Sequence, residues 1–494
     1  MPYALVAMTR KKPNILFIMA DNHPAALLGC YGNPEIHTPN LDKLASESVK
    51  FKQAYCVNAM CSPCRASVLT GLMPSQHGVH TWIDDRNMQA WPDKWNALAD
   101  TETLPEILKD NGYQTALIGK YHLGSPFKAQ NGFDHWVTFP HGHTRDFYGN
   151  TFIENESKNV YEGHSVDGFT EKAVQYLNQL NQEKPFFMFL SYNGPYGHWP
   201  AIKGKRRHRF ANLYDDCPMN SVPREGLSKE AIQRYLMRQE KSGGGLDYSA
   251  VLRIPNDLES LRNYYSEMTL VDDCIGQILT TLDQQNLTKD TLIIYTTDHG
   301  FSLGHHGFWG HGQATWPSNT HKEAFHISLL IKHKGKLQAR ENDDLISQLD
   351  LFPTLLEYVG IQANRDLPAI NFKDTLLDKN LTSKREAVFM EQEETRSIRT
   401  KDWLYMKRFK DSASYPLEDE LYNIATDPKE RNNLIGDSKY KNTLSQLDAH
   451  LESYFSSYST PKFDLWNGGT AKSNSDKTFF WKDSWGTRWS PTFG

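Results

Sequence analysis

Short apolar segments alternate with amphipathic ones over about the first 300 residues of the chain. Apolar runs of this length, bounded by polar residues, are typical of buried strands, and they occur at residues 14–20, 115–119, 185–190 and 291–296. Helical periodicity predicts helices at about 103–111, 166–181 and 257–283. The alternation predicts an α/β fold with a large, mostly parallel sheet and helices on both faces.

The pattern changes beyond about residue 375. Residues 397–407 alternate as hairpin strands do, and a helix is expected at about 438–455. We therefore expect a main domain at 1–375, with an insertion at 200–256, and a C-terminal antiparallel-sheet subdomain at 376–494. The end of that subdomain is rich in aromatic residues, which suit either a strap on the surface or a wall for sugar rings.

The composition limits the classes of function. A chain of 494 residues with 12 tryptophans, 23 tyrosines and a formal charge of −5 is globular and carries no basic stripe for nucleic acid. Its one basic cluster, at 203–209, is either a solvated loop or a rim that attracts a polyanionic substrate. Six cysteines make no disulfide framework, no apolar run reaches the ~20 residues of a membrane helix, and no clear signal peptide is present.

Polar residues follow three of the predicted strands directly. Asp21, Lys120 and Asp298 each stand just after an apolar run. Ligands of α/β sheets bind beyond the carboxyl ends of the strands, so these side chains should meet at one edge. The pairs Asp21-Asn22 and Asp298-His299 would bring hard oxygen ligands for a divalent cation, although each pair alone is also typical of a turn.

Residues 61–71 read Cys-Ser-Pro-Cys-Arg-Ala-Ser-Val-Leu-Thr-Gly. Pro63 suits the first position of a helix, and Gly71 suits its end. Cys61 would then lie at a helix N-terminus, which favours an anion, and Arg65 adds a planar fork of donors for an oxyanion. The run predicts a site that processes anions.

Two other interpretations of this run remain. Cys61 and Cys64 form a C-x-x-C pair, which occurs in redox proteins, or they could be purely structural. A zinc site would need a second pair of that spacing, and the sequence has none.

The run resembles the signature of the type I sulfatases of the alkaline phosphatase superfamily, Cys-x-Pro-x-Arg followed by Thr-Gly. Cys61, Pro63, Arg65, Thr70 and Gly71 all match it. Residues 119–124 are similar to the family's Gly-Lys-Trp-His-Leu-Gly segment, and residues 420–434 to its C-terminal segment. The resemblance implies the alkaline-phosphatase-like sandwich for the main domain.

The resemblance also implies the chemistry of the site. Cys61 would be oxidised by a maturation enzyme to Cα-formylglycine, whose hydrate attacks sulfur and forms a covalent sulfoenzyme. A calcium ion would be held by Asp21, Asn22, Asp298 and His299.

Further roles carry over from the family's motifs. Lys120 would bind the diol and the sulfate, with Arg65 offsetting the charge. His122 would take a proton from the second hydroxyl, and period-two spacing in an extended stretch would put it on the same face as Lys120. His198 would help to bind sulfate and protonate the leaving oxygen, as suits an imidazole.

The sequence departs from its relatives at two places. Asn22 stands where many relatives have a second aspartate, which removes a negative charge from the cation site. His311 stands where a lysine is expected, and a longer loop then brings Lys322 before Glu323. Either His311 or Lys322 could serve the leaving group.

The sequence therefore predicts a sulfuric ester hydrolase, a sulfatase acting on a sulfated carbohydrate. A phosphonate or phosphate ester hydrolase of the same superfamily is one alternative, and a catalytically dead glycan-binding homologue is another. The family suggests a periplasmic or secreted location.

Overall fold

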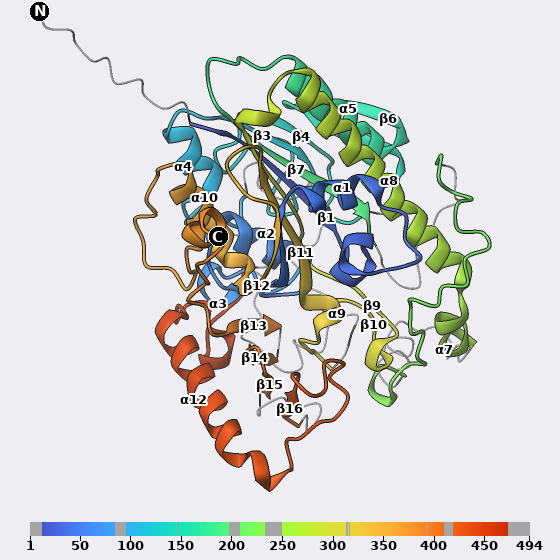
Figure 1. Ribbon diagram of the computed structural model, residues 1–494, viewed down its shortest axis with the longest axis vertical. Helices are drawn as coiled ribbons and strands as arrows, with labels where there is room; N and C mark the ends of the chain where they lie inside the picture. Colours follow the sequence, from blue (N-terminus) through green and yellow to red (C-terminus); the bar gives the residue numbers. More distant parts are fainter. Residues whose placement is uncertain are drawn as a thin grey trace, which may run out of the picture.

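A ten-stranded mixed sheet forms the centre of the protein (Figure 1). The computed structural model describes residues 12–83, 95–144, 146–196, 208–232, 249–312, 315, 317–392, 394–409 and 418–472. In spatial order the strands are β12 (Arg340–Ser347), β2 (Val49–Tyr55), β11 (His326–His333), β8 (Thr291–Thr297), β1 (Asn14–Asp21), β7 (Phe186–Pro195), β3 (Gln114–Gly119), β4 (His135–Thr138), β5 (Tyr148–Glu154) and β6 (Ser157–His164).

The middle of the sheet is parallel. Strands β8, β1, β7, β3 and β4 run in one direction, so their carboxyl ends meet at the same edge. Strand β1 is buried on both faces, and its side chains alternate between two cores. Phe17 and Met19 belong to one core, and Leu16 and Ile18 belong to the other.

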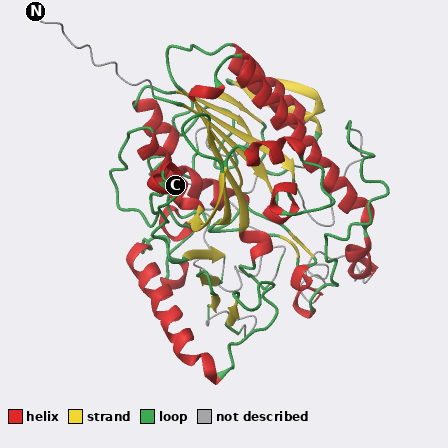
Figure 2. Ribbon diagram, viewed as in Figure 1, coloured by secondary structure: helices red, strands yellow, loops and turns green. Residues whose placement is uncertain are grey.

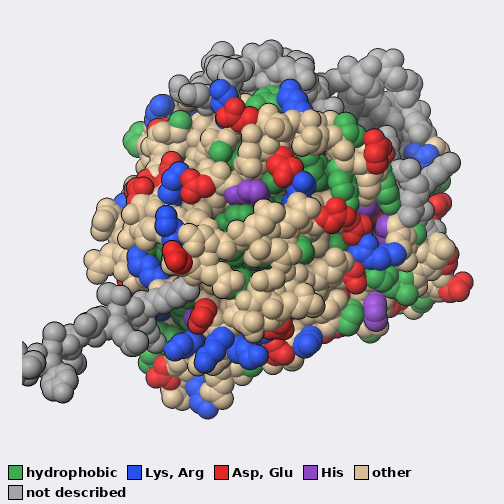
Figure 3. Space-filling model, turned by 90° about the horizontal axis from the view of Figure 1, so that it is seen from above, with side chains coloured by type: hydrophobic (Ala, Val, Ile, Leu, Met, Phe, Trp, Pro, Cys, Tyr) green, Lys and Arg blue, Asp and Glu red, His purple; other side chains and the backbone are tan. Residues whose placement is uncertain are grey.

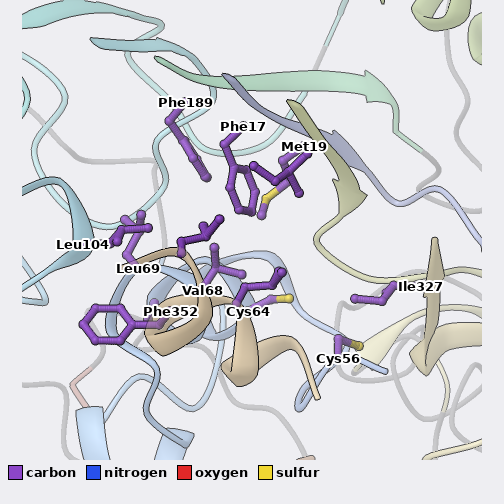
Figure 4. Packing of buried hydrophobic residues seen from close by; sticks show 14 of the residues in the cluster. Phe17, Met19, Cys56, Cys64, Val68, Leu69, Leu104, Phe189, Ile327 and Phe352 are labelled. Atoms are coloured by element: carbon purple, nitrogen blue, oxygen red, sulfur yellow. The ribbon is translucent and has the colours of Figure 1, made fainter. Parts of the chain in front are cut away.

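Helices cover both faces of this sheet (Figure 2). One face carries α1 (Pro39–Ser46), α5 (Ser165–Asn178) and α8 (Leu258–Gln284), and the other carries α2 (Cys61–Thr70), α4 (Leu104–Asp110) and α10 (Leu351–Tyr358). Figure 4 shows the second face, where Val68 and Leu69 of α2 lie among Phe17, Phe189 and Phe352.

A second sheet lies at the lower end of the molecule in Figure 1. It is antiparallel, in the order β13 (Val388–Gln392), β14 (Thr395–Arg399), β15 (Trp403–Arg408) and β16 (Glu420–Asn423). Helix α12 (Lys441–Tyr458) packs on it through Leu451 and Phe455, which join Ile398 and Leu421 in one cluster. Apart from 3-10 helices, the other short elements of the described residues are α3 (Pro74–His77), α7 (Ser249–Arg253), α9 (Lys322–Phe325), α11 (Lys373–Leu377), β9 (Ser302–Leu303) and β10 (Trp309–Gly310).

The predicted α/β fold and the C-terminal antiparallel sheet are confirmed. The four predicted strands correspond to β1, β3, β7 and β8, and the predicted helices to α4, α5, α8 and α12. Apolar periodicity did not reveal β2, β11 and β12, in which charged and polar residues interrupt the pattern. The domain division at 375 stays a prediction.

The predicted insertion at 200–256 is only partly within the described residues. Its segment 208–222 packs back onto α8, where Tyr214, Met219 and Val222 join Tyr264 and Tyr265 in one apolar cluster. Most of the basic cluster at 203–209, and the tail beyond residue 472, lie outside the described residues.

The surface agrees with the small net charge. Basic and acidic side chains are interspersed on the face that Figure 3 shows. No helix among the described residues is both long and apolar enough to cross a membrane.

Gly119, the last residue of β3, sets the position of the residue that follows it. Its φ is +116°, and a Cβ added there would lie 1.8 Å from the carbonyl oxygen of Ser191 in β7. The N–H of Lys120 donates to that same oxygen at 2.7 Å. Only glycine permits this approach of two backbones, so Gly119 places Lys120 at the edge of the sheet.

Replacing Gly119 by alanine should therefore destabilise the protein. We expect the free energy of unfolding to fall by about 2–4 kcal/mol. The new Cβ must displace the backbone of β7, and alanine must also adopt the unfavourable φ of residue 119. Urea denaturation followed by tryptophan fluorescence measures the change. The matched control is Gly436→Ala, where an added Cβ meets nothing within 4 Å; an equal effect of both changes would contradict the argument.

Candidate active site

Helix α2 carries Cys61 at its first position, with its N-terminus at the edge of the large sheet. The helix begins at Cys61 itself, so Pro63 lies within the first turn and not at its start as predicted. Proline is tolerated there because the first N–H groups of a helix have no partner within it. Gly71 ends the helix with a φ of 69°, as expected, and its N–H donates to the Ser67 carbonyl at 2.8 Å.

The three strand-end residues meet as predicted. Asp21 is the last residue of β1, and Lys120 and Asp298 directly follow β3 and β8. The Lys120 ammonium donates to Asp21 Oδ2 at 2.6 Å and lies 3.1 Å from the sulfur of Cys61. The same sulfur is 3.6 Å from Asp21 Oδ1 and 3.6 Å from His299 Nε2.

Arg65 holds the group together from the side of α2. Its NH2 donates to Asp298 Oδ2 at 3.0 Å and lies 3.8 Å from Asp21 Oδ2. Its NH1 donates to the Lys120 carbonyl at 2.9 Å and to the Ser191 hydroxyl. The charges of two carboxylates and two cations thus cancel, and each of the four side chains is at most 1% exposed.

This environment shifts the pKa of each carboxyl differently. Burial, together with the neighbouring Asp298, raises the pKa of Asp21. Burial acts on Asp298 as well, but His299 and Arg65 outweigh it and hold the pKa of Asp298 below its ordinary value. Burial alone would lower the pKa of Lys120, yet Asp21 carries that pKa above its ordinary value.

The thiol of Cys61 is not set up as a nucleophile. Burial, with a smaller contribution from Asp21, raises the pKa of this thiol well above its ordinary value. The thiol therefore stays protonated at neutral pH, whereas catalytic cysteines have a lowered pKa. This argues against the redox interpretation of the C-x-x-C pair.

The same group has donors that fit a divalent cation. One ligand atom from each of Asp21, Cys61, Asp298 and His299 lies within 4.8 Å of the others. His299 Nδ1–H donates to the Gly300 carbonyl at 2.8 Å, which leaves Nε2, 3.8 Å from Asp298 Oδ1, as the ring nitrogen that can bind a cation when the ring is neutral. Carboxylate oxygens suit calcium or magnesium.

Asn22 borders this group through its backbone, and its role as a cation ligand stays a prediction. Its backbone N–H donates to Asp298 Oδ1 at 3.1 Å, and its φ of 55° is one that asparagine tolerates. The Tyr264 hydroxyl donates to its carbonyl oxygen. Its side-chain Nδ2 lies 3.2 Å from His311 Nε2.

His122 is buried and is linked to α2 through Ile83, but it does not lie in an extended stretch. Strand β3 ends at Gly119, and His122 has a φ of 58°, so the period-two argument does not apply. Its Nε2–H donates to the Ile83 carbonyl at 2.8 Å, and the Ile83 N–H donates to Ser62 Oγ at 3.0 Å. The proton on Nε2 leaves the lone pair on Nδ1.

The other predicted residues fall in different places. His198 lies outside the described residues. The His311 ring packs on the His299 ring, with centroids 4.2 Å apart. Lys322 donates to the Pro428 carbonyl and lines a cavity of about 630 Å³ whose described wall also includes Phe301 and Glu323, but not Cys61.

Three residues of the site escaped the sequence analysis. Ser191 accepts from Arg65, and Tyr196 places its ring 5.0 Å from the Lys120 ammonium. Ser191 lies within β7, directly after the predicted strand at 185–190, and Tyr196 directly follows β7, so a polar residue after a predicted strand was the available signal. Tyr264 lies within α8, 242 residues from Asn22, and nothing in the sequence marks it.

Comparison with known protein families gives two matches. Residues 13–361 match the family model described as Sulfatase. Residues 312–456 match the one described as N-sulphoglucosamine sulphohydrolase, C-terminal.

Known relatives extend over most of the chain. It is 28% identical to N-acetylglucosamine-6-O-sulfatase of Bacteroides thetaiotaomicron, over 90% of this chain and 86% of that protein. It is 27% identical to the Ulvan-active sulfatase of Formosa agariphila, over 89% and 80% of the two chains. Human iduronate 2-sulfatase is 27% identical, over 73% of this chain and 71% of that protein.

Solved structures share the fold. One, described as a complex with its substrate D-glucosamine-2-N,6-O-disulfate, has a TM-score of 0.73 and 25% identity over 91% of this chain and 98% of its own. The phosphonate monoester hydrolase of Agrobacterium radiobacter has a TM-score of 0.66 and 20% identity, over 90% and 96% of the two chains. The fold expected from the resemblance is confirmed.

The buried charge balance can be tested with Lys120→Ala, which leaves Asp21 and Asp298 with Arg65 alone. In the presence of a chelator, we expect the free energy of unfolding to fall by about 3–5 kcal/mol, because a buried charge loses its partner. Urea denaturation measures the loss. Lys322→Ala, which removes only a contact to a backbone carbonyl, should cost less than about 1.5 kcal/mol; equal losses would refute the balance.

Proposed function

This chain belongs to the sulfatase family of sulfuric ester hydrolases, and we propose that it cleaves a sulfate ester of a carbohydrate by means of a hydrated formylglycine at residue 61. The observation that carries the proposal is the position of Cys61. It lies at the N-terminus of α2, 3.1 Å from the Lys120 ammonium, within a group of two buried cations and two buried carboxylates. Lys120 can donate to a sulfate oxygen there, and a divalent cation held by the carboxylates would offset the charge of the sulfate.

Maturation gives residue 61 the reactivity that the thiol lacks. A maturation enzyme, with an oxidant that it supplies, would take two electrons from the CH2SH of Cys61, release its sulfur and leave an aldehyde, to which water adds to give two hydroxyls. Lys120 and Asp21 lie within reach of these oxygens, at the distances they keep from the sulfur. Lys120 can donate to the diol and to the sulfate, while Arg65 holds Lys120 and Asp298 in place.

The proposed reaction has two stages. One hydroxyl of residue 61 attacks sulfur, the bond between sulfur and the sugar oxygen breaks, and the sugar oxygen takes a proton. Loss of a proton from the second hydroxyl then expels sulfate from the covalent sulfoenzyme and restores the aldehyde. A thiol could not complete this stage, because it has no second hydroxyl.

Two histidines would move these protons. His122 carries its own proton on Nε2, held by the Ile83 carbonyl, so its Nδ1 lone pair can accept the proton of the second hydroxyl. His198, which follows β7 in the sequence, would donate a proton to the sugar oxygen.

The cation site has a proposed set of ligands. Asp21, Asn22, Asp298 and His299 would hold one divalent cation, and we propose calcium because oxygen donors dominate the set. When bound, such an ion polarises the sulfate oxygens and withdraws charge from sulfur.

The relatives' substrates guide the choice of sugar. The similar N-acetylglucosamine-6-O-sulfatase, and the similar structure with a glucosamine disulfate, make a 6-sulfated glucosamine the first substrate to test. The partners would be this sulfated saccharide and the maturation enzyme. We propose a periplasmic or extracellular place of action, where such polysaccharides are met.

The role of residue 61 gives a direct prediction. Mass spectrometry of its peptide should show loss of sulfur and two hydrogens and gain of one oxygen, after expression with a maturing enzyme. Cys61→Ala should abolish sulfate release, because it removes the nucleophile. Cys64→Ser, at a variable position of the motif, should keep both the aldehyde and activity. Turnover by a chain that holds only unmodified Cys61 would overturn the mechanism.

The choice of reaction can be tested against its rival. The likeness in fold to a phosphonate monoester hydrolase makes phosphonate and phosphate esters the relevant alternatives. Parallel assays on 4-nitrophenyl sulfate, phosphate and phenylphosphonate esters should show the highest kcat/KM for sulfate. A large preference for a phosphorus ester would reject our proposal, and no turnover by matured protein would favour a glycan-binding role.

Removal of the cation should abolish most activity. After dialysis against a chelator, verified by elemental analysis, we expect kcat/KM to fall about 100-fold, because polarisation of the substrate by the cation is worth several kcal/mol. Calcium should restore the rate. Full activity in verified metal-free protein would rule out the cation.

A further inference from the structure

The two positions at which the chain departs from its relatives contact each other. Asn22 stands in place of an expected aspartate, and His311 in place of an expected lysine. They are 289 residues apart in sequence, yet Asn22 Nδ2 lies 3.2 Å from His311 Nε2. The two departures therefore fall on one contact.

The neighbours of His311 determine where its proton lies. His311 Nδ1 is 2.9 Å from the Ala59 carbonyl oxygen. A carbonyl can only accept, so Nδ1 carries the proton, and in the neutral ring Nε2 then carries a lone pair. That lone pair must accept from the amide NH2 of Asn22, which fixes the amide with its NH2 toward His311 and its oxygen on the other branch.

This orientation matters because Asn22 lies beside the acidic group. Its backbone N–H bonds Asp298 Oδ1 at 3.1 Å, and the His311 ring also packs on His299, at 4.2 Å between centroids. His311 thus touches two of the four proposed cation ligands. A cation is bound by the amide oxygen and repelled by the amide NH2.

We propose that His311 is a positioning residue that turns the Asn22 amide so that its oxygen faces the cation. The proposal rests on the cation site of the proposed function. It also assigns His311 a role other than proton donor to the leaving group, because both of its ring nitrogens are already engaged, with Ala59 and with Asn22.

The hydrogen-bond chemistry of this contact favours a change at both positions over a change at one. A lysine at 311 has only donors, so it would bond the amide oxygen of Asn22 and draw it away from the cation. An aspartate at 22 offers no donor to the Nε2 lone pair of a neutral His311. Asparagine with histidine, or aspartate with lysine, satisfies the contact, and both pairs carry the same net charge.

The test is a double-mutant cycle read by calcium binding. Isothermal titration of the full-length, metal-stripped chain with calcium would compare wild type, Asn22→Ala, His311→Ala and the double variant. We expect His311→Ala to weaken binding about tenfold, the usual cost of losing a residue that orients a ligand. In the Asn22→Ala background the same change should have little effect, because the amide that it orients is gone.

Further variants separate the contact from the fold. His311→Gln keeps an acceptor and should stay within about threefold of wild type if the contact alone matters. His311→Lys should bind calcium worse than the exchanged pair Asn22→Asp with His311→Lys. The matched control is His305→Gln, a histidine of the same loop that lies beside Glu323 and should leave calcium binding unchanged.

Each outcome of these titrations supports or overturns the role of His311. Equal affinity of wild type and His311→Ala overturns this inference alone, as does an additive cycle. Unchanged calcium affinity with a lower kcat on sugar sulfates, but not on 4-nitrophenyl sulfate, would instead make His311 the proton donor. A wild-type chain that binds no calcium refutes both this inference and the cation site, whereas sulfate release tests the rest of the proposed function separately.

Discussion

The site depends on one electrostatic constraint, the balance of two buried carboxylates by two buried cations. Asp21 and Asp298 are fully buried, and burial of an unpaired carboxylate is costly. Lys120, at the edge of the sheet, and Arg65, from α2, offset that cost by pairing with the two carboxylates. Because each of the four is held by the others, the positions around residue 61 are set before any substrate arrives.

The fold supplies the geometry for this balance. Parallel strands β8, β1, β7 and β3 deliver their ends to one edge, and the close approach at Gly119 places Lys120 there. Helix α2, which packs on one face of the sheet, places Cys61 and Arg65 at the same edge. All ten of its residues are buried, so packing against the sheet and α10 leaves it little freedom to shift (Figure 4).

Departures from a family pattern are informative when the structure shows what they touch. Asn22 and His311 looked like independent changes along the chain, one reducing negative charge and the other removing a cation. Asn22 Nδ2 lies 3.2 Å from His311 Nε2, so the two positions form one contact. Under our proposal, this contact sets the orientation of the Asn22 amide beside the acidic group.

The sequence alone determined the strands of the parallel core and the residues at their ends, because buried strands are continuous apolar runs and Asp21, Lys120 and Asp298 follow them directly. It also identified Cys61 and Arg65, since a local motif carries them. Tertiary structure decided the rest. Ser191, Tyr264 and the pairing of Asn22 with His311 depend on contacts between distant segments, and the left-handed backbone of His122 depends on its packing. Local periodicity records which face of an element is buried, but not which distant side chain it meets there.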